Sequence, residues 1–124
     1  MKNKLKVIVL ENCPYSIAAL ELLTNYNIEF DKKVVNNKNK HECKTDKIST
    51  FPQIYMVNEN NEEILLGGYS DIEEIINKIN SSTNINSIKK EIKTKYSYIN
   101  NKQILRIIEI FTPSYLKVPN LRSP

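Results

Sequence analysis

The spacing of apolar and polar residues up to residue 80 predicts short strands alternating with helices. The β-branched run KLKVIVL, Lys4–Leu10, predicts a buried first strand. Further strands are predicted at residues 28–35, 51–57 and 63–66, with a polar loop at 36–39 and a turn at 58–61. Helices are predicted from Pro14 to about Tyr26, weakly at 40–47, and from a cap at Ser70 or Asp71 to about Asn80. The resulting order is β-α-β-α-β-β-α, which is typical of an α/β fold.

Beyond residue 80 the pattern predicts a polar linker, two helices and an irregular tail. The linker is expected at residues 81–86, SSTNIN, and the tail around Pro113, Pro119 and Pro124. The apolar positions of the two helices are Ile88, Ile92 and Tyr96, followed by Ile104, Leu105, Ile107, Ile108 and Phe111. We therefore expect one domain at residues 1–80 and a C-terminal extension at 81–124 that is helical and packs on that domain.

Composition narrows the class of protein. With 124 residues, 40% of them hydrophobic, the chain can bury the core of a single domain. No apolar run approaches the ~18–20 residues that cross a bilayer. Lysines are spread along the chain, so the net charge of +4 predicts a soluble surface and no nucleic-acid or membrane partner. Two cysteines far apart in sequence do not predict a disulfide scaffold, and the cytoplasm is the expected location.

The stretch ENCPYSIAAL contains the strongest candidate for chemistry, the thiol of Cys13. If Pro14 opens a helix, Cys13 is its N-cap, where free N–H groups and the helix dipole favour the thiolate. The hydroxyl of Ser16 could donate a further hydrogen bond to the sulfur. Taken alone, the same pattern also fits a small apolar cysteine that is simply buried.

Two further motifs carry candidate binding groups. In Thr50-Phe51-Pro52, a cis bond before the proline would turn the backbone of Phe51 outward, where it could pair with an extended peptide. An ordinary trans proline on an edge strand is the alternative. In Gly67-Gly68-Tyr69-Ser70-Asp71, a helix N-terminus could bind a carboxylate while Asp71 holds an ammonium group. A turn followed by a helix cap would also explain the stretch from Gly67 to Asp71.

Three motifs, taken in this order along the chain, resemble the glutaredoxins. The first motif is Cys13-Pro14-Tyr15-Ser16, the second is Thr50-Phe51-Pro52-Gln53-Ile54 and the third is Gly67-Gly68-Tyr69-Ser70-Asp71. The resemblance covers about residues 4–80. It implies a three-layer thioredoxin-like fold with a four-stranded mixed sheet, and glutathione as co-substrate. It also implies that Cys13 is the nucleophile and that Pro14, Tyr15 and Ser16 support its thiolate. The glutathione-binding residues implied are Tyr15, Thr50, Phe51, Pro52, Gly67, Gly68, Ser70 and Asp71.

The chain also departs from the glutaredoxin pattern. Ser16 stands where dithiol members have a second cysteine, so the resemblance implies a monothiol enzyme that reduces glutathione mixed disulfides and thereby deglutathionylates proteins. Leu10, followed by Glu11, stands where a cation is expected before the active cysteine. Lys44 or Lys47 could replace that cation. Cys43 is a weak candidate for a resolving thiol, because the helix expected around it runs away from the active-site edge.

Two other functions remain open at this point. Monothiol glutaredoxins with serine at this position often bridge a [2Fe-2S] cluster between two protomers, and Cys13 would then be the cluster ligand of a homodimeric carrier. Otherwise no metal site is expected. The other alternative is a catalytically weak protein with a glutaredoxin-like fold, which binds another protein through its C-terminal extension. We expect a monomer, with a homodimer possible through a cluster or through the extension.

Overall fold

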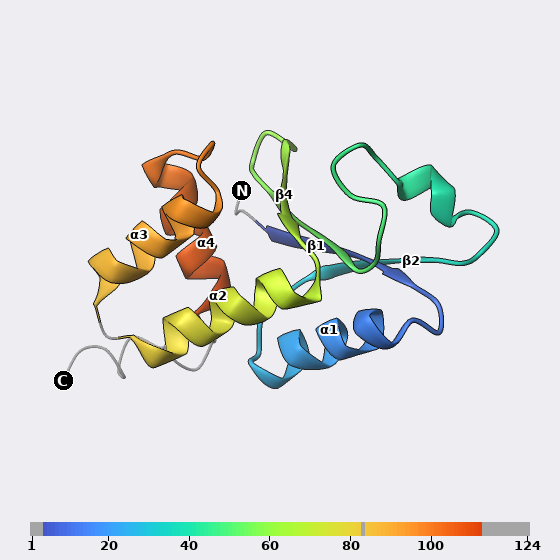
Figure 1. Ribbon diagram of the computed structural model, residues 1–124, viewed down its shortest axis with the longest axis horizontal. Helices are drawn as coiled ribbons and strands as arrows, with labels where there is room; N and C mark the ends of the chain where they lie inside the picture. Colours follow the sequence, from blue (N-terminus) through green and yellow to red (C-terminus); the bar gives the residue numbers. More distant parts are fainter. Residues whose placement is uncertain (1–3, 83, 113–124) are drawn as a thin grey trace.

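The computed structural model of the protein describes residues 4–82 and 84–112 (Figure 1). Its elements are β1 (Lys4–Leu10), α1 (Pro14–Asn25), β2 (Asp31–Val35), the 3₁₀ helix η1 (Lys40–Cys43), β3 (Gln53–Val57), β4 (Glu63–Gly67), α2 (Tyr69–Ser81), α3 (Ile85–Lys95) and α4 (Asn101–Phe111). The irregular tail predicted around Pro113, Pro119 and Pro124 lies outside the described residues.

The four strands form one mixed sheet in the order β2-β1-β3-β4. β1 runs parallel to β2 and antiparallel to β3, which in turn runs antiparallel to β4. The parallel pair is joined through α1, as a parallel connection requires, and the antiparallel pair through a tight turn. This is the mixed four-stranded α/β sheet of the thioredoxin-like fold, and it confirms the fold class predicted from the sequence.

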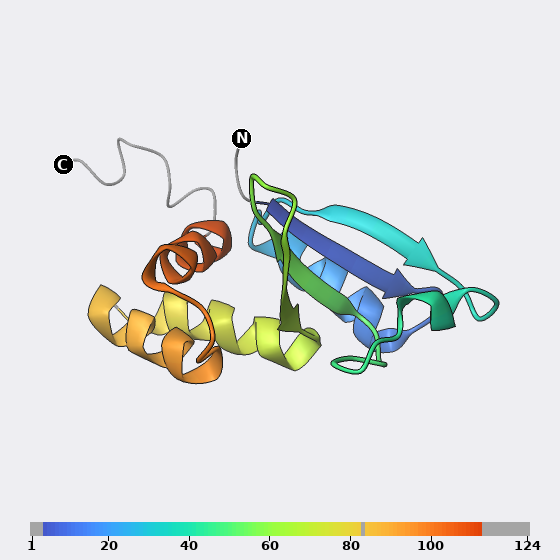
Figure 2. The same cartoon turned by 90° about the horizontal axis from the view of Figure 1, so that it is seen from above.

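The alternation of side chains along β1 directs one row into the main core. Leu5, Val7 and Val9 are buried in the main core cluster together with Ile54 and Met56 of β3. α1 and α2 lie side by side in contact with each other, with α1 against β1 and α2 against β4 (Figures 1 and 2). These two helices therefore cover one face of the sheet. The first motif, Cys13–Ser16, lies at the start of α1.

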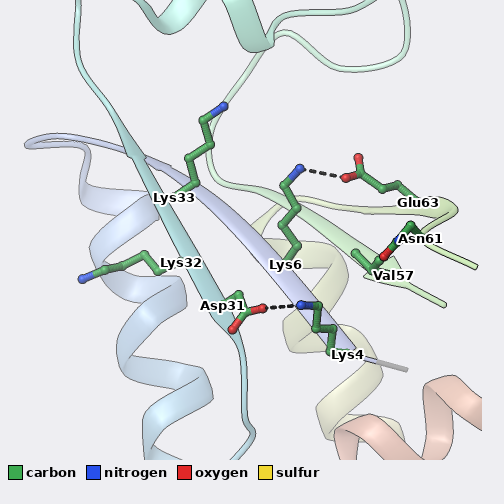
Figure 3. Close-up of a pocket in the computed structure, with 8 residues that line it drawn as sticks. All are labelled: Lys4, Lys6, Asp31, Lys32, Lys33, Val57, Asn61 and Glu63. Carbon is green, nitrogen blue, oxygen red and sulfur yellow. Dashed lines mark hydrogen bonds and ion pairs between the residues drawn. The ribbon is translucent and has the colours of Figure 1, made fainter. Parts of the chain in front are cut away.

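On the opposite face of the sheet, η1 lies over the part near the C-terminal end of β1. There the buried side chain of Gln53 donates a hydrogen bond from Nε2 to the carbonyl of Cys43, 2.9 Å away, and this bond ties η1 to the sheet. Further along the sheet is a hollow of about 410 Å³ whose lining residues include four lysines (Figure 3). Two of these lysines are paired, Lys4 with Asp31 at 2.9 Å and Lys6 with Glu63 at 2.8 Å.

The structure corrects three predicted boundaries. The helix predicted at 40–47 is a single 3₁₀ turn, because the hydroxyl of Thr45 accepts the N–H groups of Lys47 and Ile48 and forms a turn instead. β2 begins at Asp31, since the N–H of Ile28 is already bonded to the carbonyl of Leu23. β3 begins at Gln53, directly after a proline that has no N–H to donate to the ladder.

The linker predicted at 81–86 is also shorter than expected. Ser81 is the last residue of α2, and Asn84 is the N-cap of α3. The Asn84 side chain accepts the N–H groups of Asn86 and Ser87, so residues 85 and 86 are already helical. The sequence reasoning treated this asparagine as a linker residue, although asparagine is a favoured N-cap.

α3 and α4 contact each other and α2, and they lie at the end of the molecule away from η1 (Figure 2). Their buried side chains belong to the same core cluster as β1 and β3: Ile88, Ile92, Tyr96, Ile104, Ile107, Ile108 and Phe111. Leu105, predicted as part of the apolar face, is instead 46% exposed. Its position falls beside the stripe that residues 104, 107, 108 and 111 make at helical spacing. No helix among the described residues is long and apolar enough to span a membrane.

We expect α4 to contribute to the stability of the whole molecule. Phe111 is fully buried, so Phe111→Ala should lower the free energy of unfolding by about 3–5 kcal/mol. Leu105→Ala on the exposed side of the same helix is the matched control and should cost less than about 1 kcal/mol. Urea denaturation followed by circular dichroism measures both. Equal small losses would show that α4 does not share the core of the sheet.

Candidate functional site

Cys13 lies just beyond the C-terminal end of β1 and is the N-cap of α1. Asn12 makes the turn between them with a positive φ of 61°, a conformation that asparagine tolerates better than most residues. Pro14 occupies the first turn of the helix, where its missing N–H leaves no bond unmade. The carbonyl of Cys13 accepts the N–H of Ile17 at 3.0 Å, and its thiol is partly exposed.

The surroundings of Cys13 lower the pKa of its thiol. Partial burial acts in the opposite direction and is the largest single influence. The N–H of Ser16, the hydroxyl of Ser16 and the N–H of Tyr15 together outweigh it by donating to the sulfur. Since these donors bind the anion better than the neutral thiol, the folded chain holds Cys13 more readily as the reactive thiolate.

Ser16 is oriented by a bond to the strand behind it. The side chain is buried, and its oxygen accepts the N–H of Leu10 at a distance of 3.1 Å. The oxygen is thereby fixed, and the hydroxyl proton is left to point at the sulfur of Cys13. Ser16 therefore joins β1 to α1 and at the same time favours the thiolate.

The second motif lies against Cys13. The Phe51–Pro52 bond is cis, and the Cys13 thiol donates to the carbonyl of Phe51 at 3.8 Å. Gln53, which follows in the chain, is fully buried and anchored at both ends of its amide, to the Cys43 carbonyl and to the Tyr55 hydroxyl. The sequence reasoning gave Gln53 no role of its own. Thr50, before the motif, is exposed.

Two tyrosines connect the first motif with the third. The rings of Tyr15 and Tyr69 are 6.2 Å apart between centroids and tilted by 46°. Tyr15 is 65% exposed, and the hydroxyl of Tyr69 donates to Glu73 at 3.2 Å. The N-termini of α1 and α2 therefore lie next to each other. Tyr69 belongs to the third motif but was not among the predicted site residues.

The third motif forms the start of α2, with a correction to the predicted cap. The helix begins at Tyr69 with Gly68 as N-cap, whereas Ser70 or Asp71 was expected there. Asp71 caps from inside the first turn, because its Oδ2 accepts the N–H of Gly68 at 2.8 Å. Gly67 has a φ of +123°, and a Cβ at this position would lie 2.1 Å from the same carboxylate oxygen, so glycine is required. Ser70 is exposed in the first turn.

The other carboxylate oxygen of Asp71 is bound by a residue that the sequence reasoning missed. Nζ of Lys95, the last residue of α3, lies 2.8 Å from Oδ1 of Asp71 and 3.0 Å from Oε1 of Glu74. Partial burial lowers the pKa of Lys95, but the hydrogen bonds and charges of these two carboxylates raise it above its ordinary value. No local pattern links residues 71 and 95, so only the packing of α3 on α2 reveals the pair.

Lys44 or Lys47 as a replacement for the cation expected before Cys13 stays a prediction from the sequence. Leu10 ends β1, and Glu11 is exposed. Within residues 4–82 and 84–112, no hydrogen bond or ion pair joins Lys44 or Lys47 to the surroundings of Cys13. The groups that lower the thiol pKa are neutral N–H and O–H donors. The lysine-lined hollow of Figure 3 contains none of the predicted site residues.

No protein-family model matches this chain, and no curated protein matches it. Among solved structures, the chain is similar to glutaredoxin 1 from Francisella tularensis, in a crystal structure complexed with cacodylate. The two share 26% sequence identity with a TM-score of 0.47, and the match covers 64% of this chain and 99% of that chain.

The sheet order, the cysteine at the N-cap of α1 and the cis Phe51–Pro52 bond before β3 define a thioredoxin-like protein. Within that class, the family that the three motifs of this chain resemble is the glutaredoxins.

The Ser16 hydroxyl can be tested through the acidity of Cys13. In a Cys43→Ser background, Ser16→Ala should raise the pKa of Cys13, because one donor to the thiolate is lost. The pH profile of iodoacetamide alkylation should then move to higher pH, with a slower rate at neutral pH and the same plateau at high pH. The Cys43→Ser parent is the control, and circular dichroism checks that the variant is folded. An unchanged midpoint would contradict the role given to Ser16.

Proposed function

We propose that this protein is a glutathione-dependent thiol–disulfide oxidoreductase that works with a single thiol. The observation that carries this proposal is the Cys13 thiol, whose pKa is lowered at the N-cap of α1 and which lies 3.8 Å from the carbonyl of Phe51. A thiolate of this kind is a nucleophile for disulfides. A neighbouring backbone carbonyl gives an extended thiol peptide a group to pair with.

Glutathione would lie across the ends of α1 and α2. Its cysteinyl part would pair with the backbone of Phe51 and lie against the exposed ring of Tyr15. Its γ-glutamyl carboxylate would meet the first turn of α2 near Gly68 and Ser70, where the free N–H groups of a helix N-terminus favour an anion. The placement of Tyr15 against Tyr69 supports a continuous surface between the two ends.

The reaction would proceed by two exchanges. The Cys13 thiolate attacks the glutathione sulfur of a glutathionylated protein, forming a disulfide with glutathione and releasing the protein thiolate, which takes up a proton. A second glutathione, as thiolate, then attacks the glutathione sulfur of that disulfide. Oxidised glutathione leaves and the Cys13 thiolate is restored. The net change converts one mixed disulfide and one glutathione into a protein thiol and oxidised glutathione.

The single-thiol scheme is supported by the residues around Cys13. The position three residues further on is Ser16, which is buried and has no sulfur to displace the bound glutathione. Cys43 lies in η1, where its carbonyl is fixed by Gln53. The second exchange is therefore assigned to glutathione from solution. The proposed enzyme is a monomer that works in the cytoplasm, where glutathione is kept reduced. The [2Fe-2S] carrier and the interaction protein stay predictions from the sequence.

The scheme makes opposite predictions for the two cysteines. Cys13→Ser should abolish glutathione-dependent reduction of a glutathionylated peptide, because the nucleophile is lost. Cys43→Ser is the matched control and should retain most of the activity. Oxidised glutathione formed per unit time, measured through its enzymatic reduction at the expense of NADPH, gives both rates. Equal loss in the two variants would rule out a single-thiol mechanism.

A further inference from the structure

The proposed glutathione site already contains, at its α2 end, an ammonium group that belongs to the protein. Nζ of Lys95 bonds Oδ1 of Asp71 at 2.8 Å, while Oδ2 of the same carboxylate accepts the N–H of Gly68. From the sequence, Asp71 was predicted to bind an ammonium group of the ligand. Both of its oxygens therefore have partners before any ligand arrives.

The position of Lys95 is set by the docking of the segment that follows it. The Tyr96 hydroxyl donates to the carbonyl of Leu66 at 2.5 Å, and the Tyr98 hydroxyl donates to that of Leu65 at 3.0 Å. Both bonds hold the end of α3 against β4, directly before Gly67. The Lys95 ammonium also lies 5.8 Å from the centre of the Tyr96 ring, and its side chain is only 22% exposed. These contacts fix the charge beside the first turn of α2.

The charges around this point determine what the site can bind. Asp71 and Glu74 each contribute one negative charge, and Lys95 contributes one positive charge between them. An incoming ammonium would have to approach Oδ1 of Asp71 past the like charge of Lys95. An incoming carboxylate would meet the free N–H groups of the first turn of α2, and Lys95 offsets part of the repulsion from Asp71 and Glu74.

We propose that Lys95 is a specificity-determining residue that takes the place of the ligand's α-ammonium at Asp71. This inference rests on the proposed thiol–disulfide exchange at Cys13. The site then accepts thiols that end in a carboxylate without requiring a neighbouring amino group. Its ligand class is wider than glutathione and includes carboxylate-ended thiols that lack the amino group.

The two matched probes are oxidised glutathione and the disulfide of glutaryl-cysteinyl-glycine, which is glutathione without its amino group. In each case the Cys13 thiolate attacks one sulfur, forms a mixed disulfide and releases one thiolate. Mass spectrometry of the full chain in a Cys43→Ser background measures both rates. The ratio of the two rates, divided by the same ratio for the urea-unfolded chain, reports only the selectivity of the folded site.

The parent chain should show a selectivity ratio near unity. Lys95→Met should raise the ratio in favour of glutathione roughly fivefold, the effect of about 1 kcal/mol for one partly exposed charge. Lys95→Arg should keep the parent ratio, because it keeps the positive charge. Lys90→Met, an exposed lysine on the same helix, is the control and should also keep the ratio.

A purely structural ion pair would slow both probes together or lower stability in Lys95→Met, and the ratio would not change. That result would overturn the inference while leaving the thiol chemistry intact. A parent chain that already prefers glutathione strongly, with no further gain in Lys95→Met, would also overturn it. If Cys13 formed no mixed disulfide with either probe, the proposed function and the inference would fail together.

Discussion

The carboxylate of Asp71 connects three parts of the molecule that are separate in sequence. One oxygen closes the N-terminus of α2 through Gly68, and the other holds the end of α3 through Lys95. The same carboxylate fills the space where a side chain at residue 67 would lie, so the strand before it must end in glycine. The end of β4, the start of α2 and the docking of the C-terminal helices therefore depend on one another. A change at any of them alters the surface at the α2 end of the proposed glutathione site.

The reactive end of the site is built from neutral donors. The N–H groups of Tyr15 and Ser16 and the Ser16 hydroxyl lower the pKa of Cys13 against the opposing effect of burial, without help from a lysine or arginine. Dipoles at a helix N-terminus act over short distances, so this stabilisation depends on the exact fit between β1 and α1. The bond from Leu10 to Ser16 maintains that fit. Lys95 lies beside the start of α2, at the opposite end of the proposed site from the thiol.

α3, α4 and the segment between them cover an edge of the sheet and contribute to its core, besides placing Lys95 beside the site. β4 is an edge strand, and its carbonyls at Leu65 and Leu66 are bound by the hydroxyls of Tyr98 and Tyr96. Covering an edge in this way removes groups that could otherwise pair with another chain. Phe111 and its neighbours extend the same core beneath the sheet. The helices beyond residue 84 are therefore bound to the fold by both polar and apolar contacts.

The sequence by itself determined the features that depend on neighbours along the chain. The periodicity of apolar residues predicted the strands and most helices, and Pro14 after Cys13 predicted the N-cap thiol, because these signals are local. The position of Asp71 relative to Gly68 was also local, although the cap lies two or three residues earlier than predicted. Tertiary structure alone decided the pair between Asp71 and Lys95, the contact of the Tyr15 ring with the tilted Tyr69 ring and the burial of Gln53 against Cys43. Those contacts join elements far apart in sequence, and they follow from how the helices pack on the sheet, which no local pattern encodes.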